Sequence, residues 1–312
     1  MTSLNFANGV LFFPVTPFSE SGAVELDRFS AHVESRLEGR PGGVFAACGT
    51  GEFHALSSAE AAMVVSAAVE TVAGRVPVIA GVGGCLGAAI EGARAAAKVG
   101  ADGLLLLPPY LVAGTTAGLV AWVRAVMSAT DLPVIVYHRA TARFTPSAIL
   151  ELAADPRLVG FKDGIGDIAL AQEIALTSKR LDRPLAMFNG LLTAELSQSA
   201  YRAIGVPLYS SAAFAMIPEV ANVFYHAYSC GNDEVCEDVL RRFYQPLVAL
   251  RDETPGFGVS LIKAGLRLRG FDVGSVRPPL VDPTHAQLDR LQEILDEGFS
   301  LSSEYSQVVG AR

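Results

Sequence analysis

The sequence contains little cysteine, with four in 312 residues and no two arranged as a CxxC pair. These residues are Cys48, Cys85, Cys230 and Cys236. Structural zinc sites use closely spaced cysteines, and disulfide scaffolds are short chains dense in cysteine. No histidine stands at metal-ligand spacing from another histidine either. We therefore predict neither disulfides nor a bound metal.

Long apolar runs are also lacking, although only 18% of the residues are charged. A transmembrane helix needs about 20 apolar residues in succession, and every long apolar stretch here is interrupted by a glycine, a proline or a charge. The N-terminal sequence MTSLNFANGV has no basic region followed by an apolar stretch, as a secretory signal would. We predict no membrane association and, by default, a cytoplasmic location.

Basic residues are in the minority, with 24 Lys and Arg against 32 Asp and Glu and a formal net charge of −8. Nucleic acids bind proteins that cluster Lys and Arg, so a nucleic-acid partner is not expected. A small anionic substrate remains compatible with this charge, because a local pocket can be positive on an acidic protein.

What the sequence does contain is an alternation of two kinds of segment. Short apolar runs are followed by longer stretches rich in Ala and Leu. The runs are continuously apolar, which is typical of parallel strands buried on both faces. They are Val10–Val15, Gly43–Ala47, Val76–Ala80, Gly103–Leu107, Pro133–Tyr137, Leu158–Lys162, Leu185–Asn189 and Val206–Tyr209. Eight strands, each followed by a helix, predict an α/β fold closed into a (β/α)8 TIM barrel.

Capping patterns mark several helices, and the end of the chain is helical throughout. Ser57 and Glu60 have capping-box spacing, and Thr145 precedes a first-turn proline. After Ala212 the expected helices have no strands between them; they are Met216–Tyr228, Asp233–Arg251, Gly258–Arg269 and Thr284–Gly298. We predict a barrel with the active site over residues 1–230 and a C-terminal helical extension over residues 231–312.

A doubly wound open sheet is the competing architecture. It usually places a Gly-rich phosphate loop after its first strand, and Pro14–Pro17 cannot form one. In a barrel, functional groups gather at the C-terminal ends of the strands. The residues at those ends are Thr16, Cys48–Glu52, Gly81–Gly84, Pro108–Tyr110, Tyr137, Lys162, Asn189–Gly190 and Ser210–Ser211.

Lys162 is the most informative of these strand ends, since the chain has only four lysines. Burial of a lysine favours the neutral amine, which is the nucleophile that attacks ketones. Tyr137 ends the preceding strand and would lie beside Lys162 at a strand spacing of about 4.8 Å, where a phenol can relay protons. The alternatives are a lysine paired with Asp163 or Asp167, and a tyrosine that only caps a barrel layer.

The Gly49–Glu52 segment supplies backbone N–H groups with little side-chain obstruction, which suits a carboxylate or a phosphate. A simple glycine turn is the alternative. His54, His138 and Arg139 lie near the same face, and Cys48 is more typical of a small buried apolar residue than of a nucleophile.

Three motifs in this order and spacing, Gly49–Glu52, Tyr137 and Gly160–Asp163, resemble those of the dihydrodipicolinate synthase/N-acetylneuraminate lyase superfamily of class I aldolases and dehydratases. The resemblance extends from about Val10 to Thr284. Four longer segments resemble those of a decarboxylating dehydratase in this family. They are Phe12–Phe18, Ala47–Leu56, Leu107–Leu111 and Val159–Asp167.

The resemblance implies conversion of 5-dehydro-4-deoxy-D-glucarate, a keto sugar acid, to 2,5-dioxopentanoate, water and carbon dioxide, with no metal or organic cofactor. Lys162 would form a Schiff base with the ketone and Tyr137 would relay protons. Gly49 and Thr50 would hold the neighbouring carboxylate. The distal hydroxyl or carboxylate would meet Asn189, Ser210 and Ser211. Family members are usually homotetramers built as dimers of dimers, so a homotetramer is expected.

The chain departs from the family in two places. Tyr110 is followed by Leu111, where synthases of the family commonly have two adjacent tyrosines. The segment His138–Arg143 carries Thr141 in a stretch where the dehydratases often have an asparagine. The identity of the sugar acid depends on this segment more than the Schiff-base chemistry does.

Other functions remain open at this stage. A class I aldolase that cleaves a 2-keto-3-deoxy sugar acid to pyruvate and an aldehyde would use Lys162 and Tyr137 equally well. A keto-acid sensor is the alternative outside enzymes, although a pure binder has no need of a buried amine. Arg139 or Arg143 could offset the charge of a dianionic substrate, or could be an ordinary surface arginine.

Overall fold

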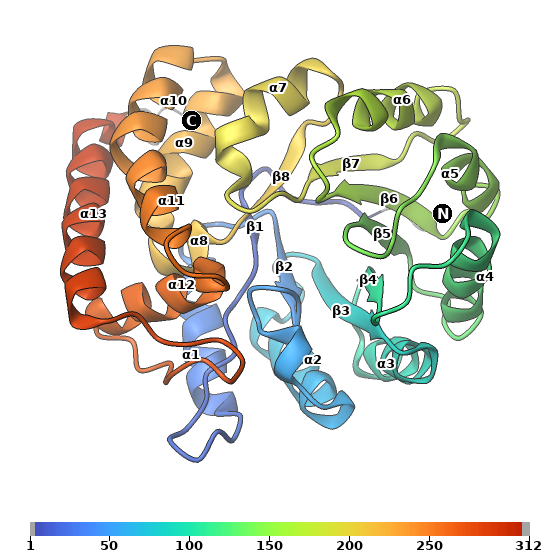
Figure 1. Cartoon of the computed structure of the whole chain (residues 1–312), viewed down its shortest axis with the longest axis horizontal. Coiled ribbons are helices and arrows are strands. Elements are labelled where there is room, and N and C mark those ends of the chain that lie inside the picture. Colours follow the sequence, from blue (N-terminus) through green and yellow to red (C-terminus); the bar gives the residue numbers. More distant parts are fainter. Residues whose placement is uncertain (1–3, 308–312) are drawn as a thin grey trace.

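The computed structural model describes residues 4–307, which form a closed barrel of eight parallel strands (Figure 1). The strand order follows the sequence, and the last strand pairs back with the first. The strands are β1 (Leu11–Phe12), β2 (Gly43–Ala46), β3 (Val78–Gly84), β4 (Gly103–Pro109), β5 (Val134–His138), β6 (Leu158–Asp163), β7 (Ala186–Asn189) and β8 (Leu208–Ser211). The predicted (β/α)8 fold is confirmed, and the open-sheet alternative is wrong.

The connecting helices surround the barrel (Figure 1). They are α1 (Leu26–Leu37), α2 (Ser58–Val72), α3 (Leu86–Val99), α4 (Thr116–Met127), α5 (Pro146–Leu152), α6 (Ile168–Ser178) and α7 (Gln198–Ala203), with 3₁₀ segments η1 (Phe53–Ala55) and η2 (Ala194–Ser197). Ser57 and Glu60 form the predicted capping box of α2, and Thr145 caps α5 ahead of its first-turn proline. These hydrogen bonds satisfy backbone N–H groups that a helix start leaves free.

The strands bury both faces, as their continuous apolarity predicted. The inner face fills the barrel with a cluster that includes Leu11, Phe13, Phe45, Ile79, Leu105, Ile135 and Phe188. Phe45 stacks on Phe6 and on Phe13, at ring-centroid distances of 5.8 and 4.5 Å. Phe6 also lies against Gly43, the first residue of β2. Side chains therefore fill the N-terminal end of the barrel, and a substrate cavity is expected at the C-terminal ends of the strands.

The chain after β8 is helical, as predicted. Its elements are α8 (Ala213–Met216), α9 (Pro218–Cys230), α10 (Asp233–Val239), the π-helical η3 (Leu240–Tyr244), α11 (Gln245–Arg251), α12 (Phe257–Leu268) and α13 (His285–Glu304). Helix α13 packs against α9, and α12 packs against α8. The division at residue 230 stays a prediction, because both sides of it share one apolar core. Within residues 4–307, no helix is both long enough and apolar enough to cross a membrane.

A buried ion pair joins this C-terminal region to the loop after β2. Lys263 of α12 places its Nζ 2.7 Å from Oε1 of Glu52, and both side chains are fully buried. Glu52 also accepts a hydrogen bond from the backbone N–H of Arg277 at 2.9 Å, and Lys263 donates one to the carbonyl of Ser275 at 2.9 Å. The predicted Gly49–Glu52 segment is thus anchored from the far end of the chain.

Removing one partner of this pair should destabilise the fold strongly. Lys263→Met leaves the Glu52 carboxylate buried without a cation, and we expect a loss of about 3–5 kcal/mol in the free energy of unfolding. The double variant Lys263→Met/Glu52→Gln should recover part of that loss, because no buried charge remains. Urea unfolding measures both, with the exposed Lys98→Met as control. A wild-type unfolding midpoint for Lys263→Met would contradict this role.

Candidate active site

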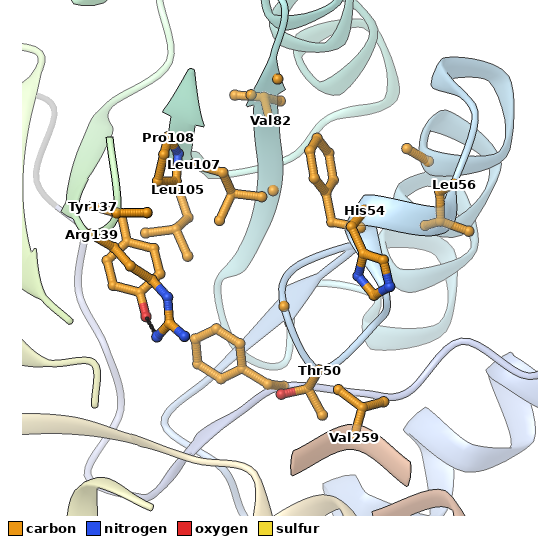
Figure 2. A pocket seen from close by; sticks show the side chains of 18 of the residues that line it. Thr50, His54, Leu56, Val82, Leu105, Leu107, Pro108, Tyr137, Arg139 and Val259 are labelled. Carbon is orange, nitrogen blue, oxygen red and sulfur yellow. Dashed lines mark hydrogen bonds between the residues drawn. The ribbon is translucent and has the colours of Figure 1, made fainter. Parts of the chain in front are cut away.

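A cavity of about 1160 Å³ opens at the C-terminal ends of the strands. Figure 2 shows Tyr137 and Arg139 on one side of it and Thr50 and His54 on the other. Among the predicted site residues, those that line the cavity are Gly49, Thr50, Tyr137, Lys162 and Ser210. Asn189 and Ser211 do not line it.

Lys162 lies in β6 with a side chain that is only 5% exposed. Its Nζ is 4.2 Å from the ring centroid of Phe13 and 4.7 Å from that of Tyr137. Burial lowers the pKa of Lys162 to about 7, with the neighbouring Cys48 opposing the shift and Arg139 adding to it. A substantial share of this lysine is therefore the neutral, nucleophilic amine at neutral pH.

The carboxylates offered as alternative partners of Lys162 are engaged elsewhere. Asp163 accepts hydrogen bonds from the backbone N–H groups of Ile165 and Gly166, at 3.1 and 3.2 Å, and from the hydroxyl of Tyr201. Asp167 caps α6. Within residues 4–307, both carboxylates thus have other partners and neither forms an ion pair with Lys162, whose Nζ lies against aromatic rings, so the ion-pair alternative is wrong.

Tyr137 lies beside Lys162, because β5 and β6 pair in the register that sets these two residues opposite each other. Its hydroxyl donates a hydrogen bond to the carbonyl of Gly190 at 2.7 Å and accepts one from Nη1 of Arg139 at 3.0 Å. Burial raises the pKa of Tyr137, and the Arg139 guanidinium opposes this shift. The phenol is protonated and held at a fixed point next to the amine, which suits a proton relay.

Two residues of the Gly49–Glu52 segment, Gly49 and Thr50, line the cavity. Within residues 4–307, the backbone N–H groups of Gly49, Thr50 and Gly51 have no acceptor. The segment is held by the hydroxyl of Thr16, which donates to the carbonyl of Gly51 at 2.7 Å, and by the left-handed backbone of Glu52 (φ 57°). Successive unpaired N–H groups in a fixed turn form a binding site for an anion.

Asn189 and Ser211 do not line the cavity and instead form hydrogen bonds with the segments that follow β7 and β8. The Asn189 amide donates to the carbonyl of Ala194 and to the side chains of Ser197 and Gln198, at 3.0–3.1 Å. The Ser211 hydroxyl accepts from the backbone N–H of Phe214 at 3.2 Å. For a direct substrate contact, the Asn189 side chain would have to leave its network.

The structure also places Thr141, which the sequence analysis singled out, at the cavity, and it adds Arg251, which sequence reasoning did not assign. Thr141 lines the cavity and donates a hydrogen bond to the carbonyl of Pro109 at 2.7 Å, which ties the loop after β5 to the end of β4. Arg251 reaches the cavity from α11, far from the barrel strands in sequence.

Burial raises the pKa of Cys48 to about 12, so its thiol is not a nucleophile at neutral pH.

Gly190 determines where Lys162 can lie. A Cβ added at Gly190 would meet Lys162 Cε at 2.5 Å and Cγ at 2.7 Å, well inside van der Waals contact. We expect Gly190→Ala to displace the amine and to slow reductive trapping of a small 2-keto acid on Lys162 by about 100-fold. Gly87→Ala is the matched control, since nothing lies within 4 Å of its added Cβ. Trapping at the wild-type rate in a folded Gly190→Ala protein would refute this steric role.

Comparison with known proteins places this site in a family. The model of the dihydrodipicolinate synthetase family matches residues 6–298. A Streptomyces griseus protein named "Probable 5-dehydro-4-deoxyglucarate dehydratase" is 49% identical over 305 residues, covering 97% of this chain and 95% of its own. A Rhizobium rhizogenes protein of the same name is 44% identical over 290 residues, covering 93% of this chain and 95% of its own.

Solved structures agree with the sequence comparison. The crystal structure of dihydrodipicolinate synthase from Oceanobacillus iheyensis matches with a TM-score of 0.86 at 28% identity, covering 95% of this chain and 97% of that one. The match runs through the barrel, its strand ends and the C-terminal helices alike, and the chain therefore belongs to the dihydrodipicolinate synthetase family.

Proposed function

We propose that this chain is a decarboxylating dehydratase that converts 5-dehydro-4-deoxy-D-glucarate to 2,5-dioxopentanoate, water and carbon dioxide through a Schiff base on Lys162. The names of its relatives support the substrate. The observation that carries the chemistry is the buried Lys162 amine. It lies 4.7 Å from the centroid of the Tyr137 ring in a cavity that Gly49 and Thr50 also line, and among the described residues the N–H groups of these two have no acceptor.

The reaction begins with the substrate's keto acid end. The N–H groups of Gly49 and Thr50, with the Thr50 hydroxyl, bind the carboxylate beside the ketone. The Lys162 amine adds to the ketone carbon, and loss of water from the carbinolamine leaves an iminium. Tyr137 carries the protons that these two steps release and consume, because its hydroxyl is held by Gly190 and Arg139 on a ring that lies against the amine.

The iminium then acts as an electron sink for two bond cleavages. It acidifies the neighbouring CH₂, and loss of one proton there gives an enamine. The enamine electrons expel the β-hydroxyl, which leaves as water after protonation. The resulting conjugated iminium accepts the electron pair of the distal carbon–carboxylate bond, so that carbon dioxide leaves. Protonation and hydrolysis return the Lys162 amine and release the aldehyde product.

The remaining predicted residues, Asn189, Ser210 and Ser211, stand at the ends of β7 and β8. Ser210 lines the cavity and contacts the distal hydroxyl or carboxylate. Asn189 and Ser211 act indirectly in this proposal, because their hydrogen bonds hold the chain around the ends of β7 and β8. A contact of either residue with substrate remains a prediction.

The predicted homotetramer and cytoplasmic location also remain proposals. An apolar surface that suits contact between subunits lies at the end of β4. There Tyr110, Leu111 and Val112 are 72%, 78% and 68% exposed, and Leu111 holds a left-handed backbone at φ 66°. Large apolar side chains gathered on a surface are typical of protein interfaces.

The test is to incubate the protein with 5-dehydro-4-deoxy-D-glucarate, reduce with borohydride, and locate the adduct by intact mass and peptide mapping. We expect an adduct on Lys162 and, in the unreduced reaction, release of carbon dioxide. Lys162→Ala should abolish both, whereas Lys98→Ala, which changes an exposed lysine, should retain both. Release of pyruvate and an aldehyde would make the protein an aldolase. Failure to form an adduct with any 2-keto acid would refute the Schiff base.

A further inference from the structure

Arg139 stands in a loop that is fixed on several sides. Its backbone N–H donates to the carbonyl of Ala142 at 3.1 Å, and the N–H of Ala142 donates back at 2.9 Å. The Nδ1 of His138 accepts from the backbone N–H of Phe144 at 2.9 Å, and the Thr141 hydroxyl ties the loop to Pro109. The backbone that carries the Arg139 side chain is therefore held in place before any ligand binds.

The guanidinium of Arg139 points into the cavity beside the Tyr137 hydroxyl (Figure 2). It is half-buried, and its Nη1 donates to that hydroxyl at 3.0 Å. Within residues 4–307, no carboxylate pairs with it, and its other N–H groups have no acceptor. A guanidinium has five N–H donors in a planar fork, so most of the Arg139 donors remain available to a ligand.

The other cavity arginine is already neutralised. Arg251 donates to the Asp252 carboxylate at 2.8 Å and to the Thr193 hydroxyl at 2.7 Å. Arg143, the second arginine of the loop after β5, is exposed and does not line the cavity. Among the described residues, Arg139 is thus the cavity arginine without an anion, in a chain with a formal net charge of −8.

We infer that Arg139 binds the second carboxylate of the substrate and makes the site selective for keto diacids over keto monoacids. This inference rests on the proposed function for the identity of the substrate. The Gly49 and Thr50 N–H groups take the carboxylate beside the ketone, which leaves the distal carboxylate without a cation of its own. An arginine fork that is fixed by its loop and free of internal partners matches that carboxylate in charge and shape.

The experiment uses two probes that differ only in the distal carboxylate, 2-oxoadipate and 2-oxohexanoate. Each is titrated against the protein with borohydride, and the half-saturating concentration for the Lys162 adduct is read by mass. We expect the wild type to require a roughly 10- to 100-fold lower concentration of the diacid. Arg139→Gln should remove that difference, and the matched control Arg143→Gln should keep it.

Trapping of pyruvate separates this inference from the proposed function. Pyruvate has no distal carboxylate, so Arg139→Gln should trap it at a half-saturating concentration close to that of the wild type. If no variant or wild-type protein turns over the sugar acid, the proposed function fails, and the probe pair still tests Arg139. Persistence of the diacid preference in Arg139→Gln would overturn the inference. Loss of the preference in Arg251→Gln alone would overturn it as well.

Discussion

The burial of the Lys162 ammonium is the constraint on which the rest of the site depends. This lysine is 5% exposed, lies next to two aromatic rings and has no paired carboxylate within residues 4–307, so it is costly to keep charged. Burial accordingly lowers its pKa to about 7. In a purely structural lysine, the lack of a carboxylate partner would destabilise the fold. Here it leaves the amine in the neutral form that attack on a ketone requires.

The pairing of neighbouring barrel strands positions the residues around the Lys162 amine. Parallel pairing of β5 with β6 sets Tyr137 opposite Lys162, and pairing of β6 with β7 brings Gly190 close enough to accept the Tyr137 hydrogen bond. Gly190 also leaves the space that the lysine side chain occupies. The C-terminal helices complete the arrangement, since the buried Glu52–Lys263 pair anchors the Gly49–Glu52 segment, whose Gly49 and Thr50 line the cavity.

Sequence reasoning predicted the barrel and the Lys162–Tyr137 pair because both follow from local pattern. Continuous apolar runs specify buried parallel strands, and barrel geometry brings strand ends together whatever their distance in sequence. It did not tell that Asn189 faces away from the cavity, because that depends on the register of β7. Phe188 lies opposite Lys162 and faces the barrel interior, so Asn189, the next residue along the strand, points to the other face. Nor could sequence reasoning separate Arg139 from Arg143, or place Arg251, because these depend on one tight turn and on tertiary packing.

The most direct test of this account is the titration of Lys162 itself. With only four lysines in the chain, NMR of protein carrying ¹³C at lysine Cε should resolve each residue, and Lys162→Arg identifies the signal. The account predicts a Lys162 midpoint near pH 7, with the neutral amine dominant above it. A midpoint near the ordinary lysine value of about 10.4 would show that the amine is charged at neutral pH, and would contradict the account.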